Sequence, residues 1–353
     1  MRAAVYHGRR DVRVESVVEP GAPSPDELLI EVLRASICGT DASEWSHGPL
    51  QVPLERPHPG SGHRGPVVLG HEFVGRVAAA GERVAGLGPG ERVVCGAGVS
   101  CGSCEWCRAG RTNLCSAYYT LGLHADGGLA ELVRAPARIC RAVSDRCSDD
   151  AAALAQPLAV ALHAVRRSQA TAGDSVAVIG VGGIGAFILA AAAARGASPL
   201  VAVDIDEERL DTARSLGAGV VIDARSTKTA ASLRAATGGE GPEIVIEASG
   251  APESTGVALE AVRRGGLVLQ VGLHSSPGQL DLFDATIREI DIVTTNAHVC
   301  DQDLPEAVEM LETTDLGSLV IDRVIPLTAV VEEGLQPLAA GTARGKIVVD
   351  PAL

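Results

Sequence analysis

The pattern of hydrophobic and polar positions divides the chain near residue 150. Before this point, short extended stretches such as residues 27–33 and 91–94 alternate with turn-forming pairs such as Pro89-Gly90. Short runs of this kind, bounded by Pro and Gly, are typical of β-strands joined by tight turns. The first 150 residues therefore predict a mostly-β domain, with a long loop over residues 46–66, where Pro, Gly and His are frequent.

Strand-like and helix-like segments alternate after residue 150. A helix is expected over residues 150–164, interrupted at Pro157, because proline removes a backbone donor. The later segments are expected to be strands at 175–179, 200–203, 220–222, 244–246 and 267–271, and helices at 185–195 and 207–216. Such alternation predicts βαβ units and a doubly wound parallel sheet, so the fold class is α/β. The mixed pattern after about residue 295 predicts a return to the first domain, which gives domains of 1–155 with 295–353 and of 156–294.

The composition limits the classes of partner. The 353 residues are 46% hydrophobic but only 2% aromatic, which suits a core of Ala, Val, Leu and Ile around a buried parallel sheet. A net charge of −14 argues against nucleic acid and anionic membrane as partners. The start of the chain does not resemble a secretory signal, and the longest apolar run, near residues 184–194, is too short to span a bilayer. We therefore expect a cytoplasmic protein.

A glycine motif follows the strand expected at 175–179. Its residues are Gly180, Val181, Gly182, Gly183, Ile184 and Gly185. Glycines at this spacing permit a tight turn, let the backbone approach a pyrophosphate, and let a helix and a strand pack closely. The next strand ends near Asp204, nineteen residues after Gly185. A carboxylate there accepts hydrogen bonds from ribose hydroxyls and repels a 2′-phosphate, so the motif predicts NAD, with Asp206 as the alternative carboxylate.

Four of the nine cysteines lie close together and predict a metal site. Their spacing is Cys-x2-Cys-x2-Cys-x7-Cys, at Cys101, Cys104, Cys107 and Cys115. Four thiolates complete a tetrahedral shell and leave no open position, which predicts a structural zinc. An iron–sulfur cluster is the alternative, although Ser116 follows the last cysteine where ferredoxins usually have proline.

A second metal site is expected in the first domain. Cys38 lies just after an extended apolar run, and His71 and Glu72 occur together further along the same domain. One thiolate, one imidazole and one carboxylate can hold zinc and leave a position for substrate. Together with a nucleotide site, these residues indicate a zinc-dependent oxidoreductase.

The combination of these motifs resembles the zinc-containing medium-chain dehydrogenases over essentially the whole chain. The segment Gly70-His71-Glu72-x2-Gly75-x5-Gly81-x2-Val84 is similar to the zinc signature of that family, and the cysteine and glycine motifs follow in the family's order. The resemblance implies a GroES-like, mostly-β catalytic domain and a Rossmann NAD-binding domain. The start Cys38-Gly39-Thr40-Asp41 and the segment Gln156-Pro157-Leu158 resemble the polyol, threonine and 2,3-butanediol dehydrogenases. The loop over residues 48–66 and the segment 160–165 resemble the last of these most.

The resemblance also implies roles for individual residues. Cys38 and His71 would bind the catalytic zinc, and Glu72 would be a third ligand or a close neighbour. Thr40 would begin the proton relay, and Asp41 would orient His71. In the cofactor site, Arg209 would contact the adenosine ribose, and Gly272 and Leu273 would form the turn beneath the nicotinamide.

Two positions depart from the polyol subgroup. Gln156 stands where that subgroup usually has a glutamate near the zinc, so either Glu72 or Gln156 is the candidate for a further ligand. Ser43 stands where related enzymes often have a histidine, so the proton path is expected to run through Thr40 and the cofactor ribose to another group such as His47.

The sequence therefore predicts hydride transfer between NAD(H) and a small secondary alcohol or ketone, with two zinc ions per chain. The first substrate guess is 2,3-butanediol and acetoin, or another polyol. The alternatives are a cyclitol, sugar or amino-alcohol dehydrogenase and, more remotely, a non-catalytic relative. A zinc-independent reductase of the same fold is disfavoured because such enzymes lack the Cys and His ligands. A homodimer or homotetramer is expected, with the strand near Val293 as a candidate interface.

Overall fold

The computed structural model describes residues 1–225, 228–274 and 278–353. The chain forms two compact units. Unit 1 comprises Met1–Ala159 and His298–Leu353, and unit 2 comprises Val160–Ala297. No helix among the described residues is long and apolar enough to cross a membrane.

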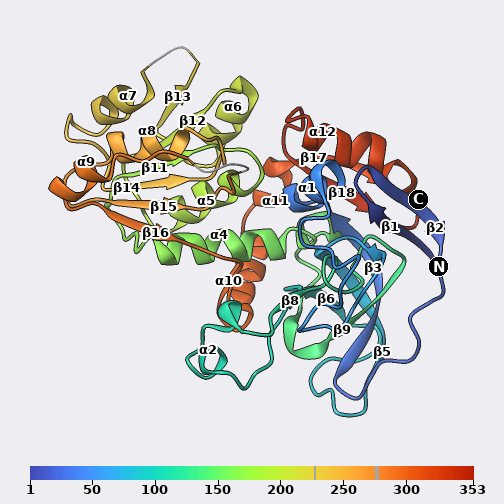
Figure 1. The fold of residues 1–353 in the computed structure, drawn as a ribbon. Helices are drawn as coiled ribbons and strands as arrows, with labels where there is room; N and C mark the ends of the chain where they lie inside the picture. The colour runs from blue at the N-terminus through green and yellow to red at the C-terminus, as the bar shows by residue number, and fades with distance from the viewer. Residues whose placement is uncertain (226–227, 275–277) are drawn as a thin grey trace. The chain divides into compact units, whose positions relative to one another are not determined.

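Unit 1 is built mainly from antiparallel strands. Its largest sheet has the order β10-β6-β5-β3-β18-β17, with β9 also paired to β3. The bounds of these strands are β3 Glu27–Ser36, β5 Glu72–Ala80, β6 Arg92–Cys95, β9 Leu132–Pro136, β10 Cys140–Ala142, β17 Ile321–Pro326 and β18 Lys346–Asp350. Because β17 and β18 join a sheet formed by the first part of the chain, the C-terminal segment completes unit 1 (Figure 1).

Unit 1 also contains smaller sheets and several helices. The smaller sheets contain β1 Arg2–Gly8, β2 Asp11–Ser16, β4 Val67–Val68, β7 Gly98–Val99 and β8 Tyr119–Thr120. The helices are α1 Gly39–His47, α2 Glu105–Arg108, α3 Asp149–Ala152, α10 Cys300–Thr313, α11 Leu316–Val320 and α12 Gln336–Ala339.

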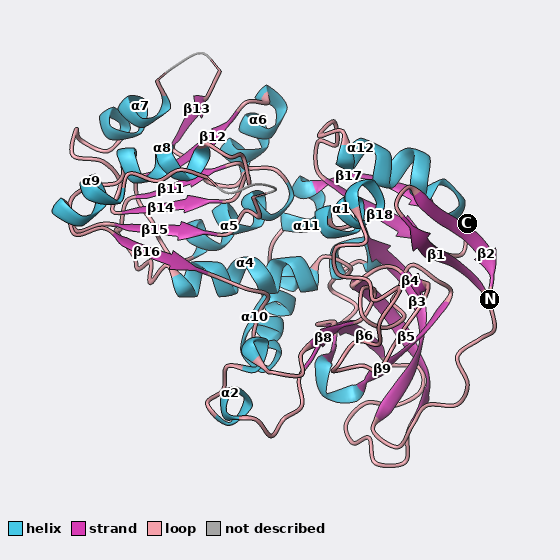
Figure 2. Ribbon diagram, in the orientation of Figure 1, coloured by secondary structure: helices cyan, strands magenta, loops and turns pink. Residues whose placement is uncertain are grey.

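Unit 2 contains a six-stranded parallel sheet with the order β13-β12-β11-β14-β15-β16. The strands are β11 Val176–Ile179, β12 Leu200–Asp204, β13 Val220–Asp223, β14 Ile244–Glu247, β15 Leu267–Gln270 and β16 Asp291–Thr294 (Figure 2). The central strands β11, β12 and β14 are buried along their whole length, as expected for a parallel sheet covered on both faces. The strand order reverses at the boundary between β11 and β14. In sheets of this kind, ligands bind at this point, outside the carboxyl ends of the strands.

Helices cover the sheet of unit 2. They are α5 Gly183–Ala194, α6 Glu207–Ser215, α7 Thr229–Ala236, α8 Ser254–Ala261 and α9 Leu282–Ile287. Side chains of α7, α8 and α9 form one apolar core with alternate residues of the central strands. This core is made of Ala, Val, Leu and Ile, without an aromatic side chain among its buried members.

The prediction of a helix interrupted at Pro157 was wrong. The chain forms α3 and then α4, Ala155–Arg167, and Pro157 lies in the first turn of α4. The backbone N–H groups of a first turn have no partner within their own helix, so proline costs little there. The break falls before Ala155, ahead of the proline.

Candidate active site and cofactor site

The sheet of unit 1 brings the expected zinc ligands together. Strands β3 and β5 are antiparallel neighbours, and Ser36 at the end of β3 pairs with Glu72 at the start of β5. Cys38, two residues beyond Ser36, therefore lies close to His71 and Glu72. One ligand atom from each of these three side chains lies within 4.8 Å of the others. This separation fits three ligands of one metal ion.

Negative groups surround His71. Asp41 is fully buried in α1, and its Oδ1 lies 3.5 Å from His71 Nδ1. Its Oδ2 accepts a hydrogen bond of 2.9 Å from the Cys38 backbone N–H. Burial lowers the pKa of His71, but Asp41 and Cys38 outweigh this effect and raise the pKa well above 6.5. The site therefore favours a cation, and Asp41 is placed to fix the ring orientation of His71, as carboxylates beside metal-binding histidines commonly do.

Glu72 has a buried cationic partner that the sequence analysis missed. Lys346 in β18 donates a hydrogen bond of 2.5 Å to Glu72 Oε2 and another of 3.0 Å to the Ile37 carbonyl. Ser36 Oγ donates to the same oxygen of Glu72. Burial lowers the pKa of Lys346, but Glu72 and neighbouring negative groups raise it above 10.5. Lys346 is one of only two lysines in the chain, which was a usable signal, but nothing local to residue 346 indicates its partner.

The other expected catalytic residues belong to the start of α1 and α4. Thr40 Oγ1 lies 3.7 Å from Cys38 Sγ, next to the ligand cluster. Gln156 is buried in the first turn of α4. Ser43 and His47 occupy exposed positions of α1, and the His47 ring lies 2.7 Å from Ser46 Oγ.

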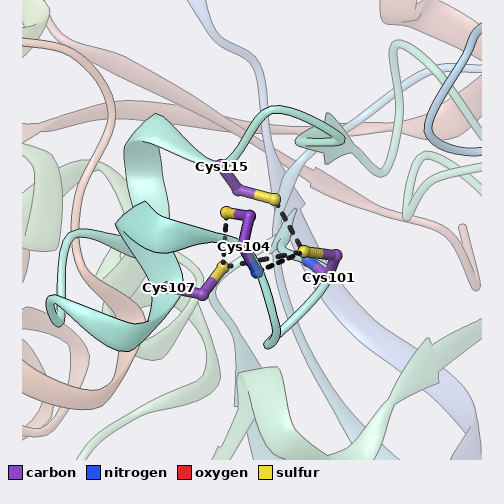
Figure 3. Close-up of side chains that lie close together, drawn as sticks. All are labelled: Cys101, Cys104, Cys107 and Cys115. Carbon is purple, nitrogen blue, oxygen red and sulfur yellow. Dashed lines mark hydrogen bonds between the residues drawn. The ribbon is translucent and has the colours of Figure 1, made fainter.

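The four-cysteine segment folds around a single point (Figure 3). The sulfur atoms of Cys101, Cys104, Cys107 and Cys115 all lie within 4.8 Å of one another. Two of the separations are 4.0 Å, from Cys101 to Cys107, and 3.5 Å, from Cys104 to Cys107. Thiolates bound tetrahedrally at about 2.3 Å from one zinc ion would be about 3.8 Å apart. The geometry therefore fits one ion, and leaves no space between the thiols for a cluster of several iron and sulfur atoms.

Backbone N–H groups stabilise the thiolate form in this segment. The N–H groups of Ser103 and Cys104 donate to Cys101 Sγ over 3.4 and 3.3 Å. Hydrogen bonds from Ser103 and Cys104 lower the pKa of Cys101 to about 6, whereas burial raises that of Cys115 to about 11. Donors that favour the charged sulfur also favour its binding to a metal cation.

The glycine motif occupies the carboxyl end of β11 in unit 2. Gly180 has a φ of +84°, and Gly182 precedes the first residue of α5. A Cβ atom on Gly185 would lie 1.8 Å from the Gly180 carbonyl oxygen, so only glycine fits there. The glycine turn thus leads directly into the N-terminus of α5, and helix N-termini after such turns favour anionic groups.

Asp204 lies at the end of β12, beside the glycine turn. Its Oδ2 accepts a hydrogen bond of 2.8 Å from the Val181 backbone N–H, and its Oδ1 lies 3.8 Å from Arg209 Nη1. The Asp206 side chain instead accepts from the Arg209 backbone N–H and caps α6. Gly272 and Leu273 follow β15 on the same edge of the sheet.

Comparison with known proteins agrees with this architecture. Residues 24–145 match the alcohol dehydrogenase GroES-like domain, and residues 183–313 match the zinc-binding dehydrogenase domain. Sorbitol dehydrogenase of Bacillus subtilis is 33% identical over 328 residues, which cover 92% of this chain and 90% of that protein. The (R,R)-butanediol dehydrogenase of the same species is 32% identical over 99% of this chain and all of its own length. The crystal structure of 2R,3R-butanediol dehydrogenase from B. subtilis superposes with a TM-score of 0.91 and 30% identity over 99% of both chains.

These findings confirm the expected fold class, a GroES-like domain with a Rossmann-like parallel-sheet domain, and the expected class of enzyme. The chain is an oxidoreductase that belongs to the zinc-dependent medium-chain alcohol dehydrogenases, in the group that contains the polyol and butanediol dehydrogenases.

Proposed function

We propose that this protein transfers a hydride between NAD(H) and a small secondary alcohol or its ketone at a zinc site formed by Cys38 and His71. The observation that carries the proposal is the convergence of Cys38, His71 and Glu72 within 4.8 Å in an oxidoreductase of this family. A zinc ion bound there supplies a Lewis acid that lowers the pKa of an alcohol hydroxyl.

The side chains around this cluster have distinct tasks in the proposal. Asp41 holds the ring of His71 in the orientation that binds metal. Thr40 would relay the hydroxyl proton of the substrate by accepting it and donating its own hydroxyl proton to the cofactor ribose, since its Oγ1 lies 3.7 Å from Cys38 Sγ and thus beside the expected metal site. Lys346 neutralises Glu72 and keeps its Oε2 in a hydrogen bond, which favours Glu72 as a neighbour of the metal rather than a permanent ligand. Gln156 is then the candidate for a further ligand.

Replacing Cys38 with serine tests this assignment. We expect Cys38→Ser to lose one zinc ion per chain and at least about 10³-fold in kcat/KM, because the ligand set falls to two protein residues. Metal analysis by plasma emission and NADH formation from a diol measure the two effects. Cys147→Ser is a matched control, since Cys147 is a buried cysteine outside both cysteine-containing clusters. Full turnover by Cys38→Ser with unchanged metal content would refute the assignment.

A second, structural zinc in the four-cysteine segment is part of the same proposal. The support is the single-ion geometry of the four sulfur atoms, together with the backbone donors to Cys101. Wild-type protein would then contain two zinc ions per chain. The four thiols must stay reduced to bind metal, which favours a cytoplasmic location.

We propose NAD rather than NADP as the cofactor. The Asp204 carboxylate is held beside the glycine turn by the Val181 N–H, where it would accept hydrogen bonds from the ribose hydroxyls of NAD. The negative charge of Asp204 would repel the 2′-phosphate of NADP. Arg209 contributes a cation on the same side, close to Gly182.

The first substrate candidates are 2,3-butanediol and acetoin. The similarity to butanediol dehydrogenase spans nearly the whole of both chains and supports this choice. The similarity to sorbitol dehydrogenase supports longer polyols as the second candidate, and cyclitols, sugars and amino alcohols belong in the same screen. Initial rates with each butanediol stereoisomer, sorbitol, xylitol and inositol distinguish them. Absence of turnover with all of them, in zinc-loaded protein that binds NADH, would favour a non-catalytic relative.

We also propose that the protein is a homodimer or homotetramer through the edge strand β16. This strand ends the sheet of unit 2, Ile292 is 41% exposed and the outer edge of β16 has no partner strand in the described residues. Antiparallel pairing of two such edges would satisfy their backbone groups. Light scattering of wild type and Ile292→Lys would test this interface, and an unchanged mass for the variant would refute it.

A further inference from the structure

Two turns at the carboxyl edge of the unit 2 sheet are in direct backbone contact. The first follows β14 and contains Ser249 and Gly250, and the second follows β15 and contains Gly272 and Leu273. A Cβ atom on Gly272 would lie 2.3 Å from the Gly250 nitrogen, and one on Gly250 would lie 2.8 Å from the Leu273 oxygen. The position of each turn therefore depends on the other.

One buried carboxylate holds the turn after β14. Glu247 has no exposed surface, and its Oε1 accepts hydrogen bonds from the backbone N–H groups of Ser249 and Gly250 over 2.7 and 3.0 Å. The hydroxyl of Ser249 donates to the same oxygen. Ser249 in turn touches the glycine motif, because a Cβ atom on Gly180 would lie 2.6 Å from Ser249 Cα. Glu247 thus fixes backbone that supports the phosphate-binding turn.

Gln270 connects this carboxylate to the second turn. Glu247 and Gln270 are paired across β14 and β15, and Gln270 Nε2 donates to Glu247 Oε2 over 2.6 Å. The same nitrogen donates to the Gly272 carbonyl over 2.7 Å. Both amide hydrogens are then used, one on the Glu247 carboxylate that holds the first turn and one on the backbone of the second turn.

Thr255 and His274 also contact Gln270, and His274 Nε2 lies 3.4 Å from Gln270 Nε2 and 3.8 Å from Glu247 Oε2. Thr255 Oγ1 lies 2.6 Å from Gln270 Oε1, and since that oxygen only accepts, the Thr255 hydroxyl donates to it. His274 Nε2 lies 3.2 Å from the Thr255 hydroxyl, which has no second hydrogen to donate. In the tautomer that carries its proton on Nε2, His274 donates to Thr255, and the hydrogen bonds then run from His274 through Thr255 and Gln270 to Glu247.

We propose that Gln270 is a positioning residue for the nicotinamide half of the cofactor, and that Thr255 and His274 hold it in place. The inference rests on the proposed function, because it takes Gly272 and Leu273 as the turn beneath the nicotinamide. Gln270 touches no cofactor atom in this scheme. It fixes the Gly272 carbonyl before the cofactor binds, so that binding does not have to order the turn.

The test compares two ligands that share the adenosine and pyrophosphate groups. NADH carries the nicotinamide and ADP-ribose lacks it, and the dissociation constants of both are measured by calorimetry on zinc-loaded protein. For Gln270→Met we expect NADH to bind about tenfold more weakly, the upper range for loss of one neutral hydrogen bond, here the bond to the Gly272 carbonyl, whereas ADP-ribose binds within about twofold of wild type. The KM for NAD should rise by a similar factor, while kcat changes less.

Two further variants separate positioning from folding. Thr255→Val removes the hydroxyl that orients Gln270 and should reproduce a smaller part of the NADH effect. Thr286→Val is the matched control, because the Thr286 hydroxyl donates to the Leu282 carbonyl within its own helix α9, and it should leave both constants unchanged. Equal losses for NADH and ADP-ribose in Gln270→Met and Thr255→Val, or no loss for NADH, would overturn the proposal. Failure of wild-type protein to bind NADH would instead overturn the cofactor assignment on which it rests.

Discussion

The buried pair of Lys346 and Glu72 offers the sharpest test of the site. Replacing Lys346 with methionine keeps the length and apolar character of the side chain but removes its charge. Glu72 is 1% exposed, and its Oε2 would lose the 2.5 Å hydrogen bond from Lys346 and keep the Ser36 hydroxyl as its one partner among the described residues. The Ile37 carbonyl would lose its bond from the same ammonium group. Leaving a buried carboxylate without its counter-charge lowers the free energy of unfolding by about 3 to 5 kcal/mol.

The expected result is a large loss of stability in unit 1. At about 2 to 4 °C for each kcal/mol in a unit of this size, a loss of about 3 kcal/mol lowers the midpoint of thermal unfolding by about 6 to 12 °C. In the wild type, the raised pKa of Lys346 means that this stabilisation is fully present below pH 10.5 and is lost as the pH rises through the raised value. The contrast between wild type and variant is therefore expected at neutral pH, where calorimetry of zinc-loaded protein can measure it.

The other lysine of the chain provides the control. Lys228, the other lysine, is exposed, and Lys228→Met should change the unfolding midpoint by less than about 2 °C. Adding Glu72→Gln to Lys346→Met removes the stranded charge and should recover most of the loss. If Lys346→Met unfolds at the temperature of Lys228→Met, with equal zinc content in both, the pair does not stabilise the site and the reasoning fails.

Three other predictions address the remaining sites. Cys104→Ser should lose one zinc ion per chain by metal analysis and should lower the unfolding midpoint, because three thiolates no longer complete the shell; unchanged metal content would contradict this. Asp204→Ser should raise the ratio of kcat/KM for NADP to that for NAD by at least about tenfold, since the charge that repels the 2′-phosphate is gone; an unchanged ratio would move that role to another residue. Burial and, to a smaller extent, the charge of His58 lower the pKa of His124 to about 4. Between about pH 4 and 6.5 the unfolded chain therefore binds more protons than the folded chain. The free energy of unfolding thus falls as the pH falls through this range. The urea midpoint of His124→Asn should fall less over this interval than that of wild type, and equal pH dependence would assign the effect to other groups.

The sequence by itself determined the features whose chemistry is local. Each of these features lies within a short stretch of the chain. The glycine motif and the carboxylate after it belong to one strand–turn–helix–strand unit, and the four cysteines belong to one segment, so the residues expected to bind cofactor or metal are close in sequence. The alternation of apolar strands and helices likewise predicted the parallel sheet, since each segment has to bury its own apolar residues. The sequence also predicted Cys38, His71 and Glu72 as ligands, but on residue type and family pattern rather than on any distance.

Only the tertiary structure decided which distant side chains meet. Lys346 reaches Glu72 because β18 pairs with β3, and β3 with β5, so a residue near the C-terminus lies beside the start of β5. Gln270 reaches Glu247 because parallel neighbours place their carboxyl ends at one edge, and the register that aligns the two residues is a property of the sheet. The position of Pro157 also depended on the tertiary structure. Proline is tolerated in the first turn of a helix, and packing, not helix propensity, determined where that turn begins. Pairings of this kind are set by strand order and register, and a linear pattern of residues carries no measure of either.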